Sequence, residues 1–319
     1  MTVPLPGPLH SHQAKLAELA DLGYTDIWSA ESDGADAFTP LALAAAWEPR
    51  LRLGTAIVPA YTRAPACFAQ SVASMADAAP GRFAIGIGSS SNVIVERWNG
   101  VPFEEPYKKV RDIVRFLNDA LAGEKVSKAY DTFEISGFRL GVRPEQKPKI
   151  LVAALREGML RLAGREADGA IINWLSPSDV SQVVPVVTAA AGGDEREIVA
   201  RIFCCPSENT DAVRTAVKFA IAAYLNVPVY AEFHRWLGRG DQLQGMWDAW
   251  KAGDRKAALA EIPDQVVDDL IVHGSPAQCR KTIQSYFDHG VTTSSLAIMP
   301  LDPELNYWQA VRDLSPSAG

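Results

Sequence analysis

The chain has 319 residues, of which 48% are hydrophobic and 22% charged, and this composition excludes a disordered or fibrous protein. Its net charge of -7, without a basic block or an arginine-aromatic stripe, argues against a nucleic-acid partner. No run approaches the roughly 20 apolar residues that a membrane span needs, and the first residues lack the regions of a signal peptide. We therefore expect a globular cytoplasmic protein with reduced cysteines, because its four cysteines form no CxxC pair.

Short apolar runs predict eight strands, and helical sequence follows each of them. The predicted strands are 2–5, 25–30, 51–58, 82–88, 150–155, 170–175, 198–205 and 293–299. The predicted helices include 37–47, 65–79, 104–121, 158–164, 210–225 and 303–314. A further helix follows Ser11 and ends at Gly23, and Ser176 or Ser178 caps another. Ser275 with Gln278 predicts a capping box at the start of the next-to-last helix.

Two stretches interrupt this alternation. Residues 125–140 read as a β-hairpin insertion, and residues 226–269 as a helical insertion whose tryptophans form a small core of its own or a lid. Alternation at this length predicts an α/β fold, a (β/α)8 TIM barrel, in one domain over residues 1–319. A doubly wound sheet is the alternative, and it is disfavoured because no GxGxxG opens the first helix.

The stretch after the fourth predicted strand is unusually polar. Residues 82–88 are apolar with glycines at 86 and 88, and Ser89-Ser90-Ser91-Asn92 follow directly. The glycines let another group approach the backbone closely. Ligands bind at the carboxyl ends of strands in such folds, so these hydroxyl and amide groups indicate a binding site. A serine-rich turn without a ligand is the alternative.

Other strand ends carry charged residues. Glu31 and Asp33 follow the second strand and are candidate catalytic acids or bases. The alternative is that these carboxylates cap a helix or are solvated in a loop. For Asp36, in the same loop, we favour this alternative. Arg156 and Gly158 open a helix, whose free N–H groups suit an anion, against a solvated arginine as the alternative.

Metal chemistry is disfavoured. His10 and His12 follow the first strand, as in metal-dependent barrel hydrolases, but no other histidine follows a core strand. No GxSxG elbow or phosphate loop is present either. Cys204 and Cys205 are interpreted as small buried fillers.

Several motifs together resemble one known family, the luciferase-like monooxygenase superfamily, in the branch of deazaflavin (coenzyme F-420)-dependent oxidoreductases. The resemblance covers nearly the whole chain. It rests on residues 19–24 (Leu-Ala-Asp-Leu-Gly-Tyr), 36–41 (Asp-Ala-Phe-Thr-Pro-Leu), 52–59 (Arg-Leu-Gly-Thr-Ala-Ile-Val-Pro), the serine stretch with 96–100, 167–174 and 273–276.

The resemblance implies a TIM barrel that binds coenzyme F-420 (8-hydroxy-5-deazaflavin), with FMN as the alternative flavin. It implies a bulge with a non-prolyl cis peptide at Ala56-Ile57 behind the ring, and an acidic residue beside the ring at Asp33. The implied ring-lining and phosphate-binding residues are Gly88, Ser89, Ser90, Ser91, Asn92 and Arg156, Glu157, Gly158, Met159. Relatives that oxidise alcohols often have a histidine where this chain has Gly34, so a base for oxidation is missing unless Glu31 replaces it.

The leading hypothesis is therefore hydride transfer between F-420 and a small organic substrate, with the reductase direction mildly favoured. The alternatives are an FMN-dependent monooxygenase, a metal-dependent barrel hydrolase and a non-catalytic binding barrel. The resemblance also implies a homodimer. Glu96, Arg97 and Trp98 are expected to fix their loop by an ion pair, against closing the site or meeting a second subunit.

Overall fold

The computed structural model describes residues 1–318 and divides into two compact units. Unit 1 comprises Met1–Ile171 and Val186–Val199, and unit 2 comprises Ile172–Pro185 and Ala200–Gly319. Three elements have residues in both units, namely β8 (Gly169–Asn173), α6 (Pro177–Ala191) and β9 (Glu197–Cys205).

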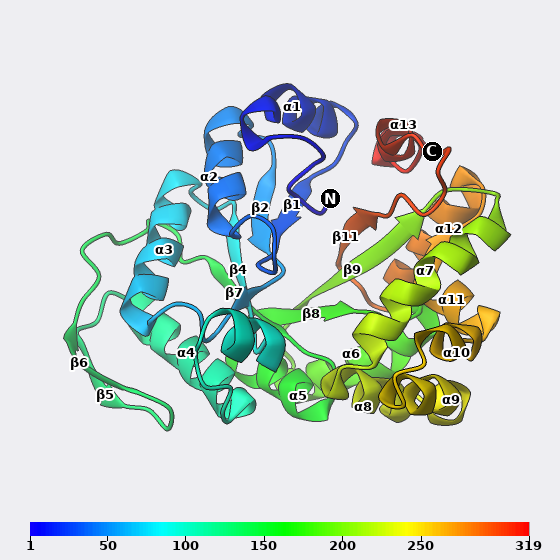
Figure 1. The fold of residues 1–319 in the computed structure, drawn as a ribbon. Helices are drawn as coiled ribbons and strands as arrows, with labels where there is room; N and C mark the ends of the chain where they lie inside the picture. The colour runs from blue at the N-terminus through cyan, green and yellow to red at the C-terminus, as the bar shows by residue number, and fades with distance from the viewer. Residues whose placement is uncertain (319) are drawn as a thin grey trace. The chain divides into compact units, whose positions relative to one another are not determined.

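Unit 1 alternates strands and helices along the chain (Figure 1). Before β8 it contains η1 (Leu9–Ser11), α1 (Gln13–Asp21), β1 (Asp26–Ser29), α2 (Phe38–Trp47), β2 (Arg52–Thr55), β3 (Val58–Pro59), α3 (Pro65–Ala78), β4 (Phe83–Gly88), η2 (Val93–Trp98), α4 (Pro106–Leu121), β5 (Val126–Ala129), β6 (Glu134–Phe138), β7 (Lys149–Ala153) and α5 (Glu157–Glu166).

The strands of unit 1 form a parallel sheet in the order β1-β2-β4-β7-β8, and β3 pairs with the far part of β4. All six residues of β4 are buried, as expected for a central strand covered on both faces. Helices α2, α3, α4 and α5 contact one another in sequence, and in Figure 1 they follow one another along the same side of these strands. The carboxyl ends of β2, β4 and β7 therefore lie beside one another.

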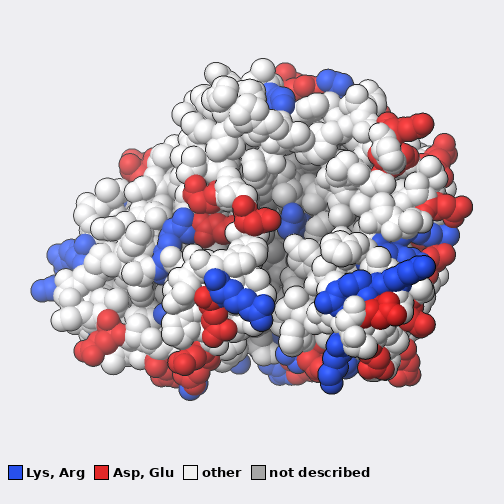
Figure 2. All heavy atoms as spheres, in the orientation of Figure 1, with Lys and Arg blue, Asp and Glu red and all other residues white. Residues whose placement is uncertain are grey.

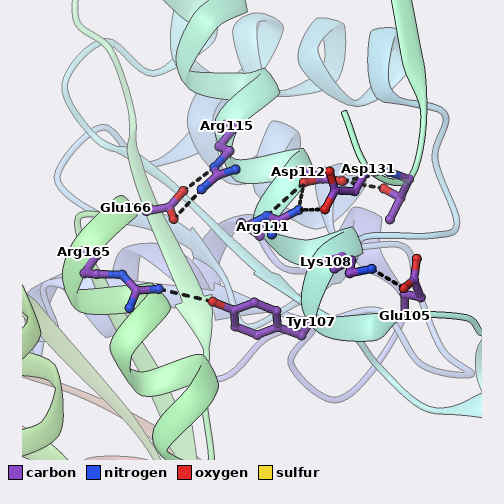
Figure 3. A network of polar contacts seen from close by, with 10 residues as sticks. Glu105, Tyr107, Lys108, Arg111, Asp112, Arg115, Asp131, Arg165 and Glu166 are labelled. Carbon is purple, nitrogen blue, oxygen red and sulfur yellow. Dashed lines mark hydrogen bonds and ion pairs between the residues drawn. The ribbon is translucent and has the colours of Figure 1, made fainter. Parts of the chain in front are cut away.

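The predicted hairpin insertion is confirmed. β5 and β6 pair antiparallel, and their loop closes through a hydrogen bond from Tyr130 N to Phe133 O of 2.8 Å. Phe116 of α4 contacts the rings of Tyr130, Phe133 and Phe138, so the hairpin packs on this helix. Asp112, one helical turn before Phe116, is buried and ties the hairpin down by polar contacts (Figure 3).

Unit 2 is mostly helical. After β9 it contains α7 (Thr210–Leu225), α8 (Pro228–Trp236), α9 (Gly240–Lys251), α10 (Arg255–Ala260), α11 (Asp264–Leu270), β10 (Ile271–His273), α12 (Pro276–Asp288), β11 (Thr293–Ile298), α13 (Tyr307–Asp313) and η3 (Pro316–Ala318). β9 pairs with β10 in parallel, and β11 pairs with β9. Helices α8 to α11 confirm the predicted helical insertion.

The insertion shares one hydrophobic core with α7 and β9. Trp247 is buried in this cluster and Trp250 packs against it, which confirms a core role for these tryptophans. Cys204 and Cys205 are fully buried, as small fillers would be. Burial raises the pKa of the Cys204 thiol, so that thiol stays protonated near neutral pH.

Three sequence predictions need correction. Residues 2–5 form no strand but only an isolated parallel bridge between Thr2 and Trp28. The three-residue strand β10 was not predicted, because it follows α11 without any intervening turn residue. The predicted strand 51–58 is divided into β2 and β3 by an irregular segment.

Helix starts agree better with the sequence. Ser275 and Gln278 form the predicted capping box of α12. Ser176 Oγ accepts a hydrogen bond from Asp179 N at 3.3 Å, and the Asp179 carboxylate accepts one in return from Ser176 N at 2.7 Å. Ser11, in contrast, lies in η1 and does not cap α1, which His12 precedes without a side-chain cap.

A buried carboxylate joins distant strands of unit 1. Glu197, at the start of β9, accepts hydrogen bonds of 2.9 Å from Arg52 of β2 and from Lys149 of β7. Burial opposes ionisation of Glu197, but the hydrogen bonds from the two cations outweigh burial and lower the pKa of this carboxyl. The network holds the amino-terminal ends of three strands together.

Acidic and basic side chains are interspersed over the face drawn in Figure 2. Surface ion pairs join Lys108 with Glu105 and Arg235 with Glu232. Within residues 1–318, none of the helices has the length and apolar character to cross a membrane.

Candidate active site

The strand edge formed by β2 and β3 carries one extra residue relative to β4. The paired residues are Leu53 with Phe83, Gly54 with Ala84, Val58 with Ile87 and Pro59 with Gly88. The register therefore shifts by one residue between β2 and β3, which is the geometry of a β-bulge. The peptide Ala56-Ile57 within the bulge is cis, which confirms this prediction from the resemblance.

Side-chain and backbone bonds hold the bulge on both sides. The Thr55 hydroxyl donates to Gly86 O at 2.9 Å and accepts from Gly86 N at 2.8 Å, and so replaces the missing backbone pairing. On the other side Ala56 N donates to Ser29 O at 2.6 Å, and Glu31 N donates to Ile57 O at 3.0 Å. The bulge is thus bonded to the strand ends of both β1 and β4.

An apolar layer supports the bulge from below. Ala56 and Ile57 pack against a buried cluster from β1, β4, β7, β8 and β9. Its members are Trp28, Ala84, Leu151, Ile171 and Val199. The bulge therefore rests on a fixed surface, as a ligand platform requires.

Neighbouring residues of the protein fill the space beside the two glycines of β4. A Cβ at Gly86 would lie 2.0 Å from Thr55 O and 2.3 Å from Ile171 Cδ1. A Cβ at Gly88 would lie 3.0 Å from Ala153 Cβ and 3.1 Å from Ile57 Cδ1. The sequence reasoning that they leave room for a close approach was right, but the approaching groups are neighbouring residues of the sheet.

The serine stretch has polar groups that the fold uses only weakly. Ser89, Ser90, Ser91 and Asn92 are all half-buried. The Ser89 hydroxyl donates to Ser90 O at 3.4 Å, and the Ser91 hydroxyl accepts from Ile94 N at 3.4 Å, both long contacts. Ser90 has a left-handed φ of 61°, which turns the chain out of β4. These hydroxyl and amide groups have hydrogen-bonding capacity left for a ligand.

The segment after the serines is a π-helical turn, η2. Its Glu96 carboxylate accepts a hydrogen bond from Phe103 N at 3.3 Å, and Val101 N donates to Val95 O at 3.1 Å. Among residues 1–318, Glu96 and Arg97 have no ion-pair partner, so the loop is fixed by backbone contacts rather than by the expected ion pair. Trp98 is 55% exposed.

Glu31 is held in an ion pair that the sequence did not reveal. Its carboxylate accepts from the Arg63 guanidinium and from Ala37 N, the latter at 3.2 Å. The Arg63 guanidinium also lies 4.7 Å from the centre of the Phe38 ring. Arg63 follows β3, and only its position after a predicted strand could have indicated a role.

Asp33 and Asp36 behave differently. Asp33 is exposed and accepts a hydrogen bond of 2.9 Å from Ser32 Oγ. Asp36 accepts from Phe38 N and Thr39 N at the start of α2, which confirms the favoured capping reading. Burial would raise the pKa of the Asp36 carboxyl, but the bonds from Thr39 and Phe38 and the nearby Arg63 charge lower it.

The predicted anion-binding residues begin α5. Arg156 precedes the helix with extended backbone and makes no side-chain cap, so the first N–H groups of α5 have no side-chain partner. Arg156, Glu157 and Gly158 are exposed and Met159 is half-buried. Glu157 pairs with Arg161 along the surface of the helix at 2.8 Å.

The strand order brings the predicted groups toward one edge. Ile57 lies beside Gly88, and Gly88 lies beside Ala153, three residues before Arg156. The bulge, the serine stretch and the start of α5 thus follow the neighbouring strands β2, β4 and β7. Glu31 joins them through the hydrogen bond from its N–H to Ile57 O, whereas Asp33 is exposed and accepts a hydrogen bond from Ser32.

The candidate histidines do not form a metal centre. His12 is buried with its Nε2 3.0 Å from Gly7 O, and His10 is exposed. In the described part of the chain, no three His, Cys, Asp or Glu side chains are grouped closely enough to hold a metal ion.

The family model described as luciferase-like monooxygenase matches residues 4–293 of this chain. The chain belongs to the luciferase-like monooxygenase family. It is 27% identical over 304 residues to 5,10-methylenetetrahydromethanopterin reductase of Methanolobus tindarius, covering 92% of this chain and 90% of the relative. It is 24% identical over 311 residues to a putative coenzyme F-420-dependent oxidoreductase of Mycobacterium tuberculosis, covering 89% and 90%.

A solved structure has the same fold. The coenzyme F-420-dependent tetrahydromethanopterin reductase of Methanopyrus kandleri superposes with a TM-score of 0.80 at 21% identity, covering 99% of this chain and 96% of that chain. This likeness confirms the predicted (β/α)8 barrel fold class.

Proposed function

We propose that this protein is an oxidoreductase that transfers a hydride between coenzyme F-420 and a small organic substrate. Support comes from a relative named as a putative coenzyme F-420-dependent oxidoreductase, which this chain matches over about nine tenths of its length. The observation that carries the proposal is the bulged end of β2 beside Gly88, because the family resemblance implies a deazaflavin ring against that position.

The residues at these strand ends suit such a cofactor. Bound F-420 supplies a carrier for the hydride. The half-buried hydroxyl and amide groups of residues 89–92 would contact its ring and hydroxylated side chain, since the protein leaves those groups weakly bonded. The first N–H groups of α5, from Glu157 to Met159, would bind its phosphate, because a helix start without a side-chain cap attracts anions.

The polar residues near the bulge favour reduction over oxidation. Oxidation of an alcohol needs a base, and the Glu31 carboxylate is occupied by Arg63. Gly34, where relatives that oxidise alcohols often carry histidine, has no side chain to offer. Reduction needs only a proton donor beside the substrate, so we favour that direction.

A paired titration of the purified protein tests the cofactor. F-420 is expected to bind at least about tenfold more tightly than FMN, a difference of about 1.4 kcal/mol, read from quenching of ligand fluorescence. Arg156→Ala is expected to weaken F-420 binding about tenfold, since it removes a cation beside the phosphate. Arg165→Ala, on the same helix but bonded to Tyr107, is the matched control and leaves binding unchanged. Tight FMN binding without F-420 binding would overturn the proposal.

Three further expectations remain proposals. The resemblance implies a homodimer, and the composition suggests a cytoplasmic protein with one domain over residues 1–319. Sedimentation velocity of the purified protein tests the first, with a monomer at micromolar concentration as the contradicting result.

A further inference from the structure

One arginine of unit 2 has no counter-charge. Arg201 lies in the middle of β9 and is half-buried, whereas the other residues of this strand are buried. Within residues 1–318 its Nε is sealed from solvent without a hydrogen-bond partner, and the guanidinium has no carboxylate partner. A charge that is partly removed from water and left unpaired lowers the stability of the fold, so its retention requires a reason.

A second arginine of unit 2 is paired. Arg239 is buried and contacts the carboxylates of Asp179 at 2.9 Å and Asp269 at 3.0 Å. The described part of unit 2 therefore supplies two acidic partners to Arg239 and none to Arg201. This difference leaves the Arg201 guanidinium free to pair with a group outside the polypeptide.

An aromatic cluster begins beside Arg201 on β9. The guanidinium lies 5.1 Å from the centre of the Phe203 ring, two residues along the strand. The ring centre of Phe203 lies 4.3 Å from that of Trp174, and the ring centre of Trp174 lies 4.8 Å from that of Tyr224. Tyr230 contacts Tyr224 at 5.8 Å between ring centres.

Two further features mark this cluster as a recognition site. Trp174 holds a left-handed φ of 54°, which is uncommon for a bulky residue, and its indole Nε1 is buried without a partner. The Tyr230 hydroxyl has only a long contact of 3.4 Å, from Asn173 Nδ2. Donors left unused beside an unpaired cation suit an acceptor-rich ligand.

We propose that Arg201 binds the carboxylate of a small organic acid whose apolar or aromatic part packs against Tyr224, the exposed ring of this cluster. A carboxylate matches the planar fork of a guanidinium, and its single charge matches the single cation of a cluster that is otherwise neutral. The Tyr230 hydroxyl is the second donor. All these residues belong to unit 2, so the inference stands whether or not F-420 is the cofactor.

Calorimetric titration with benzoate and its neutral analogue benzamide tests the site. We expect benzoate to bind at least about tenfold more tightly than benzamide, because only benzoate supplies the missing charge. Arg201→Gln should abolish this preference, and Tyr230→Phe should reduce benzoate affinity severalfold. Arg235→Gln, an exposed arginine of the same unit paired with Glu232, is the matched control and should bind as the parent does. Equal binding of the two probes, or no binding of benzoate at about 10 mM, overturns the proposal.

Thermal unfolding separates a binding role from a structural one. Without organic anions, Arg201→Met should melt at the same or a higher temperature than the parent, because it removes a half-buried charge that has no partner. Benzoate should raise the melting temperature of the parent and not that of the variant. A lower melting temperature of the ligand-free variant would assign Arg201 a structural role and overturn the proposal.

A carboxylate of the substrate and a carboxylate of the cofactor would both satisfy Arg201. Titration of Arg201→Gln with F-420 distinguishes them. Unchanged F-420 affinity assigns the site to the substrate, and weakened affinity assigns it to the cofactor. Either result leaves the proposed F-420 dependence intact, whereas loss of F-420 binding by the parent protein would refute that dependence alone.

Discussion

Close contacts at single residues decide how β2 and β4 fit together. Gly86 faces the carbonyl of Thr55 and the side chain of Ile171, and the Thr55 hydroxyl bonds both backbone groups of Gly86. No atom can be added at Gly86 without moving the backbone of the bulge. The bulge and the serine stretch are therefore coupled through this one position.

Gly86→Ala is expected to lower the free energy of unfolding by about 3 kcal/mol, because its Cβ would overlap a backbone oxygen that cannot rotate away. Gly34→Ala is the matched control. A Cβ at Gly34 meets nothing within 4 Å and its φ is not left-handed, so its effect should stay within about 0.5 kcal/mol. Urea unfolding measures both, and equal effects would contradict this account.

Sequence reasoning identified the important residues of this region but not always their partners. It predicted the cis peptide at Ala56-Ile57 and the polar end of β4. It expected another group to approach Gly86 closely, but it did not identify Thr55 and Ile171 as the groups that do so. The Glu31–Arg63 pair joins residues 32 positions apart, and no local pattern indicates such a pairing.

At the scale of elements, the hairpin β5–β6 depends on one buried carboxylate of α4. Asp112 accepts hydrogen bonds of 2.9 and 3.0 Å from the Thr132 N–H and hydroxyl, and of 2.8 Å from Arg111. Arg111 also pairs with Asp131 of the hairpin loop at 2.7 Å (Figure 3). The polar contacts lie at the loop, and Phe116 supplies the apolar contacts.

Asp112→Ala is expected to destabilise the protein by about 3 kcal/mol, because it removes a buried carboxylate and leaves the half-buried Thr132 donors and the Arg111 guanidinium without this partner. In this variant, hydrogen exchange should accelerate more at the amides of the β5–β6 hairpin than at the amides of β4. Lys108→Ala on the same helix breaks only the exposed pair with Glu105 and should change stability by less than about 0.5 kcal/mol. Uniform acceleration across unit 1 would show that the hairpin is not separately anchored.

Elements were predictable from the sequence where a capping residue, a turn residue or the spacing of apolar residues marks them. Elements without such a local signal were not predictable. Residues 210–225 match α7 residue for residue, since Asn209 caps the helix start and apolar residues repeat at helical spacing. β10 has only three residues and no turn before it, so it has no length or boundary signal. The division between β2 and β3 depends on pairing with β4, which is a long-range property.

At the scale of the whole molecule, acid sensitivity follows from a buried histidine. His234 of α8 is fully buried, and neither ring nitrogen makes a hydrogen bond of ordinary geometry. Burial, together with the charge of Arg239, lowers the pKa of His234 to about 3, although the nearby Trp174 backbone opposes this shift. The folded protein therefore holds this imidazole neutral.

The unfolded chain binds a proton at His234 below about pH 6.5, while the folded chain does so only near pH 3. Stability attributable to His234 is therefore complete above pH 6.5 and falls by about 1.4 kcal/mol per pH unit below it. His234→Leu should flatten the pH dependence of the melting temperature between pH 6 and about pH 4. His289→Gln, an exposed histidine of the same unit, should keep the parent slope; an unchanged slope for His234→Leu would refute the assignment.

The Glu197 network has a consequence for the timing of folding. Glu197 and Arg52 are 145 positions apart, so their contact closes a very long loop. The carboxylate loses its water favourably only when Arg52 and Lys149 are already in place, which puts the network after the folding barrier. Glu197→Gln should accelerate unfolding at least about tenfold in stopped-flow experiments and leave the refolding rate nearly unchanged. A slower refolding rate of the Glu197→Gln variant would contradict this order of events. In this account, Glu197 governs how long unit 1 stays folded rather than how fast it forms.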